Sequence, residues 1–343
     1  MIDAIMKELD TRKDYLEGDM IETIYFGGGT PSIVPPTQLQ KLLNHIQIEF
    51  IVSDTCEITL EANPDDIDSP MLQNWVDSGI NRLSLGVQSF HDDDLFFMNR
   101  AHSGSDALQA MSVINNSNIE RITADIIFGY SGLTEEKLLY NLAQIYQSRI
   151  HHISCYAMTV EPKTALHHQI KIGKVKATDD QLSSAQFSLI KSTLQTKGFD
   201  HYEISNYARQ DEYAIHNTHY WKNKAYLGVG PSAHSYNGKT REWNVANNSQ
   251  YLKLIHDGQT VSEVELLSKA DQYNEYIMTG LRTKWGVSLD KIKTFGPQFL
   301  AHFHAESKSL LKDLKLFEKA SSIYISNDQL ILCDSITSKL FFV

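Results

Sequence analysis

The chain has 343 residues, of which 42% are hydrophobic and 21% charged, an ordinary balance for a globular protein with one large α/β domain and a smaller one. Its formal charge of -11 argues against nucleic acid as a partner, because a polyanion would be repelled on average. The sequence contains no long apolar run of membrane-spanning length, and its first residues lack the layout of a signal peptide. We therefore expect a cytoplasmic protein.

Strand-like and helical segments alternate along the first two thirds of the chain. The chain opens in a helical pattern, since apolar residues recur at helical spacing between Ile2 and Leu16. Strand-like segments follow at 24–26, 57–61, 82–87, 122–128, 152–160 and 202–205, separated by amphipathic stretches near 37–49, 70–78, 105–115, 134–147 and 180–197. This alternation predicts an α/β fold, a partial (β/α) TIM-type barrel with its site at the carboxyl ends of the strands. Because a βα unit should begin with its strand, we expect the first strand of such a barrel to be missing.

The βα alternation stops near residue 245. We therefore divide the chain into 1–245, the partial barrel, and 246–343, a small α+β module of winged-helix-like type. Helical patterns near 263–283 and 298–317 precede two strand-like segments, 322–326 and 329–332, with a hairpin turn expected at Asn327 and Asp328. Residues 259–343 contain ten Lys or Arg and ten Asp or Glu, and this neutral balance favours a structural or partner-docking role over DNA binding.

Three consecutive glycines, Gly27 to Gly29, follow the first strand-like segment and precede Thr30 and Pro31. Without a Cβ atom, their backbone groups can approach a small polar ligand closely. Since α/β folds place their chemistry at the carboxyl ends of strands, this run is a candidate ligand loop. The alternative is a tight turn between a strand and a helix, with no ligand.

Further polar segments lie at the ends of later predicted strands. They read LEANP at 60–64, LGVQSF at 85–90 with RAH at 100–102, and ADIIFG at 124–129. Together with FGGGTP at 26–31, these segments resemble the radical S-adenosylmethionine family, and within it the coproporphyrinogen III oxidase-like branch. Matching segments at 152–157, 202–207 and 275–282 extend the resemblance over nearly the whole chain.

The resemblance implies a set of residues that bind S-adenosylmethionine. The glycine loop would hold its methionyl ammonium group, Arg100 would pair with its carboxylate, and Asp125 would contact its ribose. Hydrogen bonds would come from Glu61 and Gln88. The full set is Gly28, Gly29, Thr30, Glu61, Gln88, Arg100, Asp125 and Ala157. Taken singly, each could be a polar residue that ends a strand, and Arg100 could be one half of a surface ion pair.

The cysteines depart from the family's pattern. Relatives carry a CxxxCxxC motif before the glycine loop, and its three thiolates hold a 4Fe-4S cluster. Here Cys56, Cys155 and Cys333 lie far apart in strand-like stretches, where we expect buried, inert thiols. The chain therefore has no cluster ligands and should not carry out radical chemistry. We expect either a chain shortened at its amino terminus or a degenerate family member.

A second motif, HNTHYW at 216–221, resembles the HNxxYW element of the heme chaperones in this branch. An imidazole is a normal axial ligand of heme iron, and aromatic rings offer flat apolar faces to a porphyrin. The resemblance makes His216 the candidate ligand and His219 the reserve, with Tyr220 and Trp221 beside the heme. Without the family, a loop histidine is more often simply hydrogen bonded, and the aromatic pair could belong to the core.

Three hypotheses for the function result. The first is a heme chaperone, not an enzyme, that binds heme and S-adenosylmethionine, with a 4Fe-4S cluster only in a full-length form, and passes heme to acceptor proteins. Its partners would include a second copy of the chain and, transiently, respiratory proteins at a membrane. The second is an oxygen-independent coproporphyrinogen III dehydrogenase, which needs the absent cysteines. The third is a metal-dependent hydrolase that uses His216, His219 and Asp125.

Overall fold

The computed structural model describes residues 1–209 and 212–343. Two compact units are distinguished within it. The central unit comprises Tyr25–Pro36 and Glu57–Ala214, and the terminal unit comprises Met1–Ile24, Thr37–Cys56 and Ile215–Val343. Across the described residues, no helix is long and apolar enough to cross a membrane.

The main sheet has seven strands in the order β1-β2-β3-β4-β5-β7-β6. Its strands are β1 (Ile21–Phe26), β2 (Val52–Ala62), β3 (Arg82–Gln88), β4 (Arg121–Phe128), β5 (His152–Ala157), β6 (Asp200–Glu203) and β7 (Asn206–Ala208). Neighbours from β2 to β5 are parallel, whereas β7 pairs antiparallel with both β5 and β6. The expected partial (β/α) barrel is therefore confirmed, although the parallel pattern ends at β5 and not at the strand predicted for 202–205.

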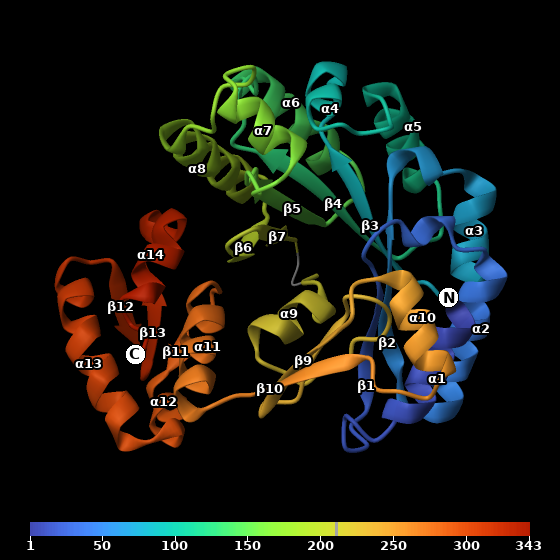
Figure 1. Cartoon of the computed structure of the whole chain (residues 1–343). Helices are drawn as coiled ribbons and strands as arrows, with labels where there is room; N and C mark the ends of the chain where they lie inside the picture. The colour runs from blue at the N-terminus through green and yellow to red at the C-terminus, as the bar shows by residue number, and fades with distance from the viewer. Residues whose placement is uncertain (210–211) are drawn as a thin grey trace. The chain divides into compact units, whose positions relative to one another are not determined.

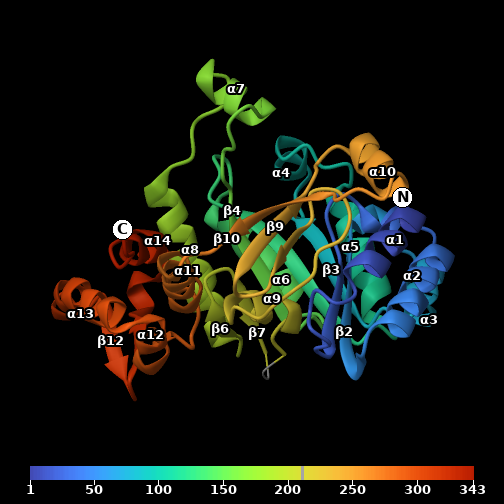
Figure 2. The ribbon, with the colours of Figure 1, turned by 60° about the horizontal axis from the view of Figure 1, so that its bottom comes forward.

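Helices cover the outer side of this curled sheet, as Figure 1 shows. They begin at side-chain caps such as Asp68, Ser103, Thr134 and Asp179, whose oxygens accept backbone N–H groups of the first turn. Figure 2 shows α7 at the end of a long excursion between β5 and α8. The helices of the central unit are α3 (Ser69–Asp77), α4 (Asp92–Phe97), α5 (Gly104–Asn115), α6 (Glu135–Tyr146), α7 (Ala165–Lys171) and α8 (Asp180–Thr196), with short 3-10 turns η1 (Pro31–Ile33) and η2 (Pro64–Asp66).

The terminal unit contains a second, antiparallel sheet. Its strands are β8 (His234–Tyr236), β9 (Thr240–Asn244) and β10 (Ser262–Leu266), in the order β10-β9-β8. The terminal unit also contains helices α1 (Ile2–Arg12), α2 (Pro36–Glu49), α9 (Ile215–Trp221) and α10 (Asn248–His256). The expected helix over 263–283 is partly wrong, because its first residues form β10 and only Lys269–Leu281 is helical. The division at residue 245 stays a prediction, and this sheet has strands on both sides of it.

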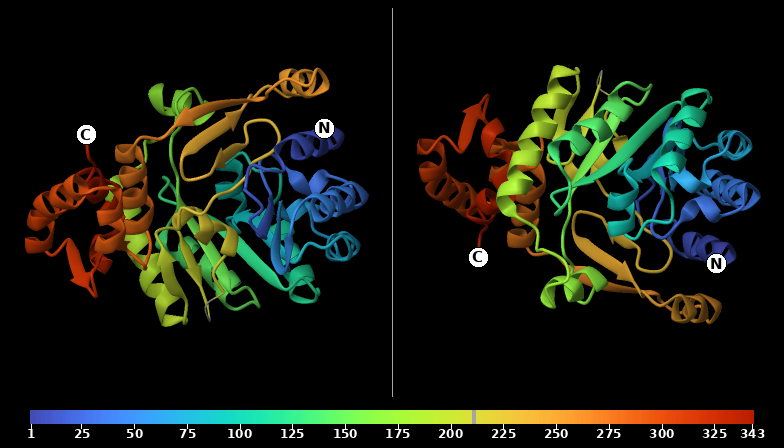
Figure 3. Two further views of the ribbon diagram at one scale, coloured as in Figure 1. Left: turned by 90° about the horizontal axis from the view of Figure 1, so that it is seen from below. Right: turned by 90° about the horizontal axis from the view of Figure 1, so that it is seen from above.

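The end of the chain forms the expected α+β module, from orange to red in Figure 3. Its elements follow the winged-helix order: α11 (Lys269–Leu281), β11 (Val287–Ser288), α12 (Leu289–Phe295), α13 (Pro297–Lys312), β12 (Leu316–Lys319), β13 (Ser322–Ile325), then η3 (Asn327–Leu332) and α14 (Cys333–Ser338). The predicted hairpin turn at Asn327 and Asp328 is wrong. The turn lies at Ala320 and Ser321, both with positive φ, and 329–332 is part of a 3-10 helix.

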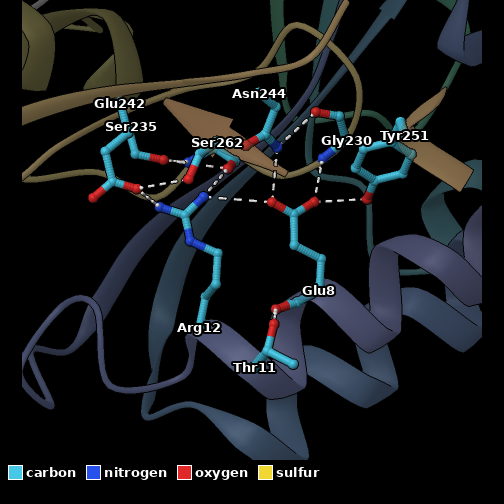
Figure 4. A network of polar contacts seen from close by, with 10 residues as sticks. Glu8, Thr11, Arg12, Gly230, Ser235, Glu242, Asn244, Tyr251 and Ser262 are labelled. Atoms are coloured by element: carbon cyan, nitrogen blue, oxygen red, sulfur yellow. Dashed lines mark hydrogen bonds and ion pairs between the residues drawn. The ribbon is translucent and has the colours of Figure 1, made fainter. Parts of the chain in front are cut away.

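A buried carboxylate attaches α1 to the second sheet, as Figure 4 shows. The Glu8 side chain is 1% exposed. Its Oε2 accepts hydrogen bonds from the Gly230 N–H at 2.8 Å and from the Tyr251 hydroxyl at 2.6 Å, and its Oε1 accepts one from the Asn244 amide at 2.7 Å. Arg12 lies 3.4 Å from Glu8 and 2.6 Å from Glu242, so positive charge accompanies the buried negative charge. These partners make the burial of the charge tolerable.

Replacing Glu8 by Ala should lower the free energy of unfolding by about 3–5 kcal/mol, because several buried donors would lose their acceptor at once. Urea denaturation measures this change. Asp3→Ala, on the same helix, is the matched control: Asp3 is exposed, and its ion-pair partner among the described residues is Lys41, so its replacement should change stability little. Equal effects of the two substitutions would contradict the importance given to the Glu8 network.

Candidate functional site

The inner face of the main sheet is polar in the central unit. Because side chains alternate along a strand, the apolar residues of β2 to β5 share the outer face and the polar ones share the inner face. Two contacts on that inner face are a 3.4 Å ion pair between Arg82 and Glu57 and a 2.8 Å hydrogen bond from Arg82 to Thr123. Both charged side chains are almost completely buried. The strand pattern of the sequence, with polar residues at every second position, could have predicted this face.

The glycine loop leaves the carboxyl end of β1. Gly28 and Gly29 have φ values of 78° and 74°, and a Cβ atom at either would meet nothing within 4 Å. Gly27 differs, since a Cβ there would lie 2.6 Å from the Tyr25 ring and 2.9 Å from a Glu61 oxygen. The loop thus requires glycine for close packing at Gly27 and for its backbone conformation at the next two positions. The adjoining Thr30 is partly buried and precedes η1.

Glu61 holds this loop in place. Its Oε1 accepts a hydrogen bond from the Tyr25 hydroxyl at 2.8 Å, and its Oε2 accepts one from the Gly28 N–H at 3.1 Å. The sequence prediction gave Glu61 a contact with the ligand and missed Tyr25 altogether. Nothing in the sequence pattern pairs the two residues, because the hydrogen bond depends on β1 and β2 lying side by side. A second clamp joins the segment after the loop to η2, where the Ser32 hydroxyl donates to Asp66 at 2.6 Å.

Gln88 combines backbone strain with an unpaired polar atom at the end of β3. Its φ is 63°, in the left-handed region that non-glycine residues rarely adopt, and the register between β3 and β4 shifts between Leu85 and Gln88. The side chain is 7% exposed, and its Oε1 has no hydrogen-bond partner among the described residues. Strained residues with unsatisfied polar atoms are typical of binding sites.

Asp125 lies at the corresponding level of β4. Its Oδ2 is 3.4 Å from the Ser84 hydroxyl, while its buried Oδ1 has no partner in the described part of the chain. Burial raises the pKa of Asp125 to about 6; the nearby Glu61 charge adds to the rise, and a hydrogen bond from Ser154 opposes it. The carboxylate is therefore ionised at neutral pH and has a free acceptor oxygen.

Arg100 adds a positive charge near Asp125. Its side chain is partly buried, and within residues 1–209 and 212–343 no carboxylate lies within ion-pair distance of it. Burial lowers the pKa of the guanidinium, and the Asp125 charge opposes this effect. The surface ion pair considered from sequence is therefore absent among these residues. Ala157, the last residue of β5, is exposed.

This set of groups fits the polar end of S-adenosylmethionine, which carries an ammonium, a carboxylate and ribose hydroxyls. The open glycine backbone, the unpaired Gln88 and Asp125 oxygens, and the Arg100 cation supply acceptors and a donor of the required kinds. The residues do not fit a 4Fe-4S cluster. All three cysteines are buried thiols outside any disulfide, and burial raises the pKa of Cys155 well above its usual value. Cys56 and Cys155 lie in strands as expected, but Cys333 begins α14, so its predicted strand is wrong.

Helix α9 in the terminal unit carries the second candidate site. His216 is partly buried, with Nδ1 2.8 Å from the Thr23 hydroxyl and Nε2 3.1 Å from the Tyr220 hydroxyl. Burial, with a smaller contribution from His219, lowers the pKa of His216 to about 4, so its imidazole is neutral at pH 7. A neutral imidazole is the form that ligates a metal. Thr23 was not predicted, since it is 193 residues away in sequence.

The other residues of the motif differ in their surroundings. His219 Nε2 is 3.6 Å from a Glu22 oxygen. Tyr220 is 41% exposed and meets Tyr226 edge-on, with ring centroids 4.7 Å apart. Trp221 lies beneath the Arg282 guanidinium, 5.4 Å from its ring centroid, and its indole nitrogen is buried without a hydrogen-bond partner in the described residues. The motif thus presents one exposed ring and one covered ring.

Two known families match segments of this chain. The radical SAM superfamily matches residues 2–143, and the HemN C-terminal domain matches residues 267–327. The heme chaperone HemW of Bacillus subtilis is 31% identical over 318 residues, which cover 91% of this chain and 83% of that protein. This chain belongs to the HemW family. HemW of Lactococcus lactis is 28% identical over 98% of this chain and 89% of its own length.

A solved structure shares the fold of this HemW family member. The coproporphyrinogen III oxidase HemN of Escherichia coli, a radical SAM enzyme, superposes with a TM-score of 0.84. The match covers 99% of this chain and 82% of HemN, at 20% sequence identity. The radical SAM match over residues 2–143 and the HemW relatives confirm the resemblance to the radical SAM family seen in the sequence. The individual ligand contacts expected for the site residues stay predictions.

The third hypothesis, a metal-dependent hydrolase, requires a metal centre. Among the residues that the structure describes, no group of three or more His, Cys, Asp and Glu side chains is arranged to hold a metal ion. No observation in those residues favours the metal-dependent hydrolase.

The strain at Gln88 can be tested by comparing the stabilities of Gly and Ala variants at two positions. The more stable replacement should be Gly at Gln88 and Ala at Ser84. Gln88→Gly should be more stable than Gln88→Ala by about 1 kcal/mol, because only glycine adopts the left-handed region without cost. At Ser84, on the same strand and not at positive φ, Ala should be the more stable replacement by about 0.5–1 kcal/mol. Thermal or urea unfolding of the four variants measures both differences. The same order at both positions would show that Gln88 is not strained.

Proposed function

We propose that the protein is a heme chaperone, which binds heme through His216 and passes it to acceptor proteins. The observation that carries the proposal is the environment of His216 on α9: a neutral imidazole whose Nδ1 contacts Thr23, which would orient the ring, with Nε2 as the proposed ligand atom. Such a hydrogen bond to the other ring nitrogen is typical of metal-ligating histidines. The names of the HemW relatives support the same function.

The neighbouring residues have distinct proposed roles. Tyr220, with its exposed ring, would contact the porphyrin face. Trp221 would help to hold α9 in place, because the Arg282 guanidinium packs over its ring. His219 stays the reserve ligand, and its Nε2 lies 3.6 Å from a Glu22 oxygen. Heme would supply an iron that accepts a nitrogen ligand, and His216 would supply an imidazole whose bond to iron can form and break without chemical turnover.

We also propose that the central unit binds S-adenosylmethionine. The backbone of Gly28, Gly29 and Thr30 would hold its ammonium group, Arg100 its carboxylate and Asp125 its ribose hydroxyls. Glu61 would act chiefly by holding the loop, Gln88 would donate or accept through its amide, and Ala157 would contact the ligand through its backbone. A 4Fe-4S cluster would supply the electron for radical chemistry where one is bound, and this chain offers it no ligands. The acceptor proteins, a homodimer, contact with membrane respiratory proteins and the cytoplasmic location stay predictions from the sequence.

Heme titration followed by absorbance tests the chaperone proposal. The protein should bind one heme. Thr23→Val should lower heme affinity about tenfold, because an orienting partner is lost while the ligand remains. His216→Ala should lower heme affinity more than Thr23→Val does. His256→Ala is the control, since the His256 side chain is 88% exposed. Unchanged binding in His216→Ala together with loss in His219→Ala would move the ligand to His219. Absence of saturable binding by the unaltered protein would overturn the proposal.

Equilibrium dialysis with labelled S-adenosylmethionine tests the second site. Arg100→Ala should weaken binding about tenfold or more, because a charge-assisted hydrogen bond is lost. Arg121→Ala, at the first residue of β4 and four residues before Asp125, should leave S-adenosylmethionine binding unchanged. Because only ionised Asp125 accepts from both ribose hydroxyls, affinity should fall as the pH drops below about 6, and Asp125→Asn should remove that dependence. Equal binding by the two arginine variants would contradict the assignment of Arg100.

A further inference from the structure

The Tyr220 hydroxyl is hydrogen bonded to the atom through which His216 would bind iron. The two residues lie one helical turn apart on α9, so their side chains meet on the same face. The Tyr220 hydroxyl is 3.1 Å from His216 Nε2, and the two rings are edge-on with centroids 4.9 Å apart. At the other side of the ring, Nδ1 is 2.8 Å from the Thr23 hydroxyl. Each nitrogen of the imidazole therefore has a hydroxyl partner.

The hydrogen-bond chemistry of a neutral imidazole makes this contact competitive. Iron requires a lone pair on Nε2, so the ring proton must be on Nδ1, where it is donated to Thr23. In that tautomer the Tyr220 O–H donates its hydrogen bond to the same Nε2 lone pair. In the other tautomer Nε2 carries the proton and Tyr220 accepts it. In either tautomer, Tyr220 must leave before an iron–nitrogen bond forms.

We propose that Tyr220 is a latch that competes with heme iron for His216 Nε2 and so favours release of the heme. This inference rests on the proposed heme chaperone function and deepens it. Binding breaks the hydrogen bond between the tyrosine hydroxyl and Nε2 and forms the bond between iron and Nε2, with no change of oxidation state. The hydroxyl then bonds to water, which is accessible because the Tyr220 side chain is 41% exposed.

The ring of Tyr220 is the first in a row of three tyrosine rings. It lies against Tyr226, and the centroid of Tyr226 is 6.2 Å from that of Tyr236. A backbone bridge joins Tyr226 to Tyr236, the last residue of β8. Freeing Nε2 requires the Tyr220 side chain to change its χ1 rotamer, because turning the ring about its own axis leaves the hydroxyl oxygen in place.

The latch has a consequence for a protein that must give up its ligand. A neutral hydrogen bond contributes roughly a five- to tenfold change in an equilibrium constant. Tyr220 would lower heme affinity by that factor and capture Nε2 again when the heme departs. The ligand geometry set by Thr23 would remain, so that binding stays specific while release of the heme becomes faster.

The test compares Tyr220→Phe, which keeps the ring and removes the hydroxyl, with Tyr226→Phe as the matched control. Tyr220→Phe should bind heme about five- to tenfold more tightly and lose it more slowly to apomyoglobin as the acceptor. Tyr226→Phe should behave as the unaltered protein. In a His216→Ala background, Tyr220→Phe should have no effect, because the nitrogen for which it competes is gone.

The outcomes separate this inference from the function on which it rests. Unchanged or weaker heme binding by Tyr220→Phe would overturn the latch and leave the chaperone proposal intact. Absence of heme binding by every protein, the unaltered one included, would overturn both. Nitrogen NMR of the His216 ring in the heme-free protein gives a readout that needs no heme: its Nε2 resonance should shift in Tyr220→Phe, and an unchanged resonance would show that the hydrogen bond does not exist in solution.

Discussion

The terminal unit depends on the buried Glu8 carboxylate. A carboxylate removed from water costs several kcal/mol unless donors surround it, and here backbone, amide, phenol and guanidinium donors converge on it. This requirement fixes Gly230 next to α1. Gly228 lies close to the backbone of His234, where a Cβ atom would be 2.1 Å from a carbonyl oxygen. The start of β8 is thereby placed, and with it the Tyr236 and Tyr226 bridge that supports Tyr220. A charge on the first helix thus contributes to the geometry around His216.

The central unit depends on a different constraint, the alternation of its strands. Apolar side chains on one face pack against the helices, which leaves polar and charged groups on the other face. There Arg82 contacts Glu57 and Thr123, whereas Gln88, at the end of β3, and Asp125, within β4, each retain an oxygen without a hydrogen-bond partner among the described residues. An unpaired buried oxygen is costly unless a ligand or water meets it, so these two oxygens are candidates for ligand contacts.

Local patterns predicted most of the central unit, because helix caps, strand alternation and glycine runs act within a few residues. The same patterns failed where tertiary contacts decide. Asn327 and Asp328 favour a turn, yet the hairpin turns at Ala320 and Ser321, since β12 pairs with β13 in that register. The candidate residues at strand ends were recognised from sequence, but their partners were not. Tyr25 meets Glu61 across two strands, and Thr23 meets His216 across 193 residues.

The two candidate sites differ in whether their proposed ligand-binding atoms have hydrogen-bond partners. In the central unit the acceptor oxygens of Gln88 and Asp125 are left without partners and backbone strain is retained, an arrangement that favours an occupied state because a ligand relieves the cost. On α9 each nitrogen of His216 has a partner, so a ligand of that ring must displace a hydrogen bond. Tight retention suits a cofactor, and weak, reversible capture suits a cargo. The hydrogen bonding of the proposed ligand-binding atoms at the two sites therefore matches a protein that keeps one small molecule and delivers another.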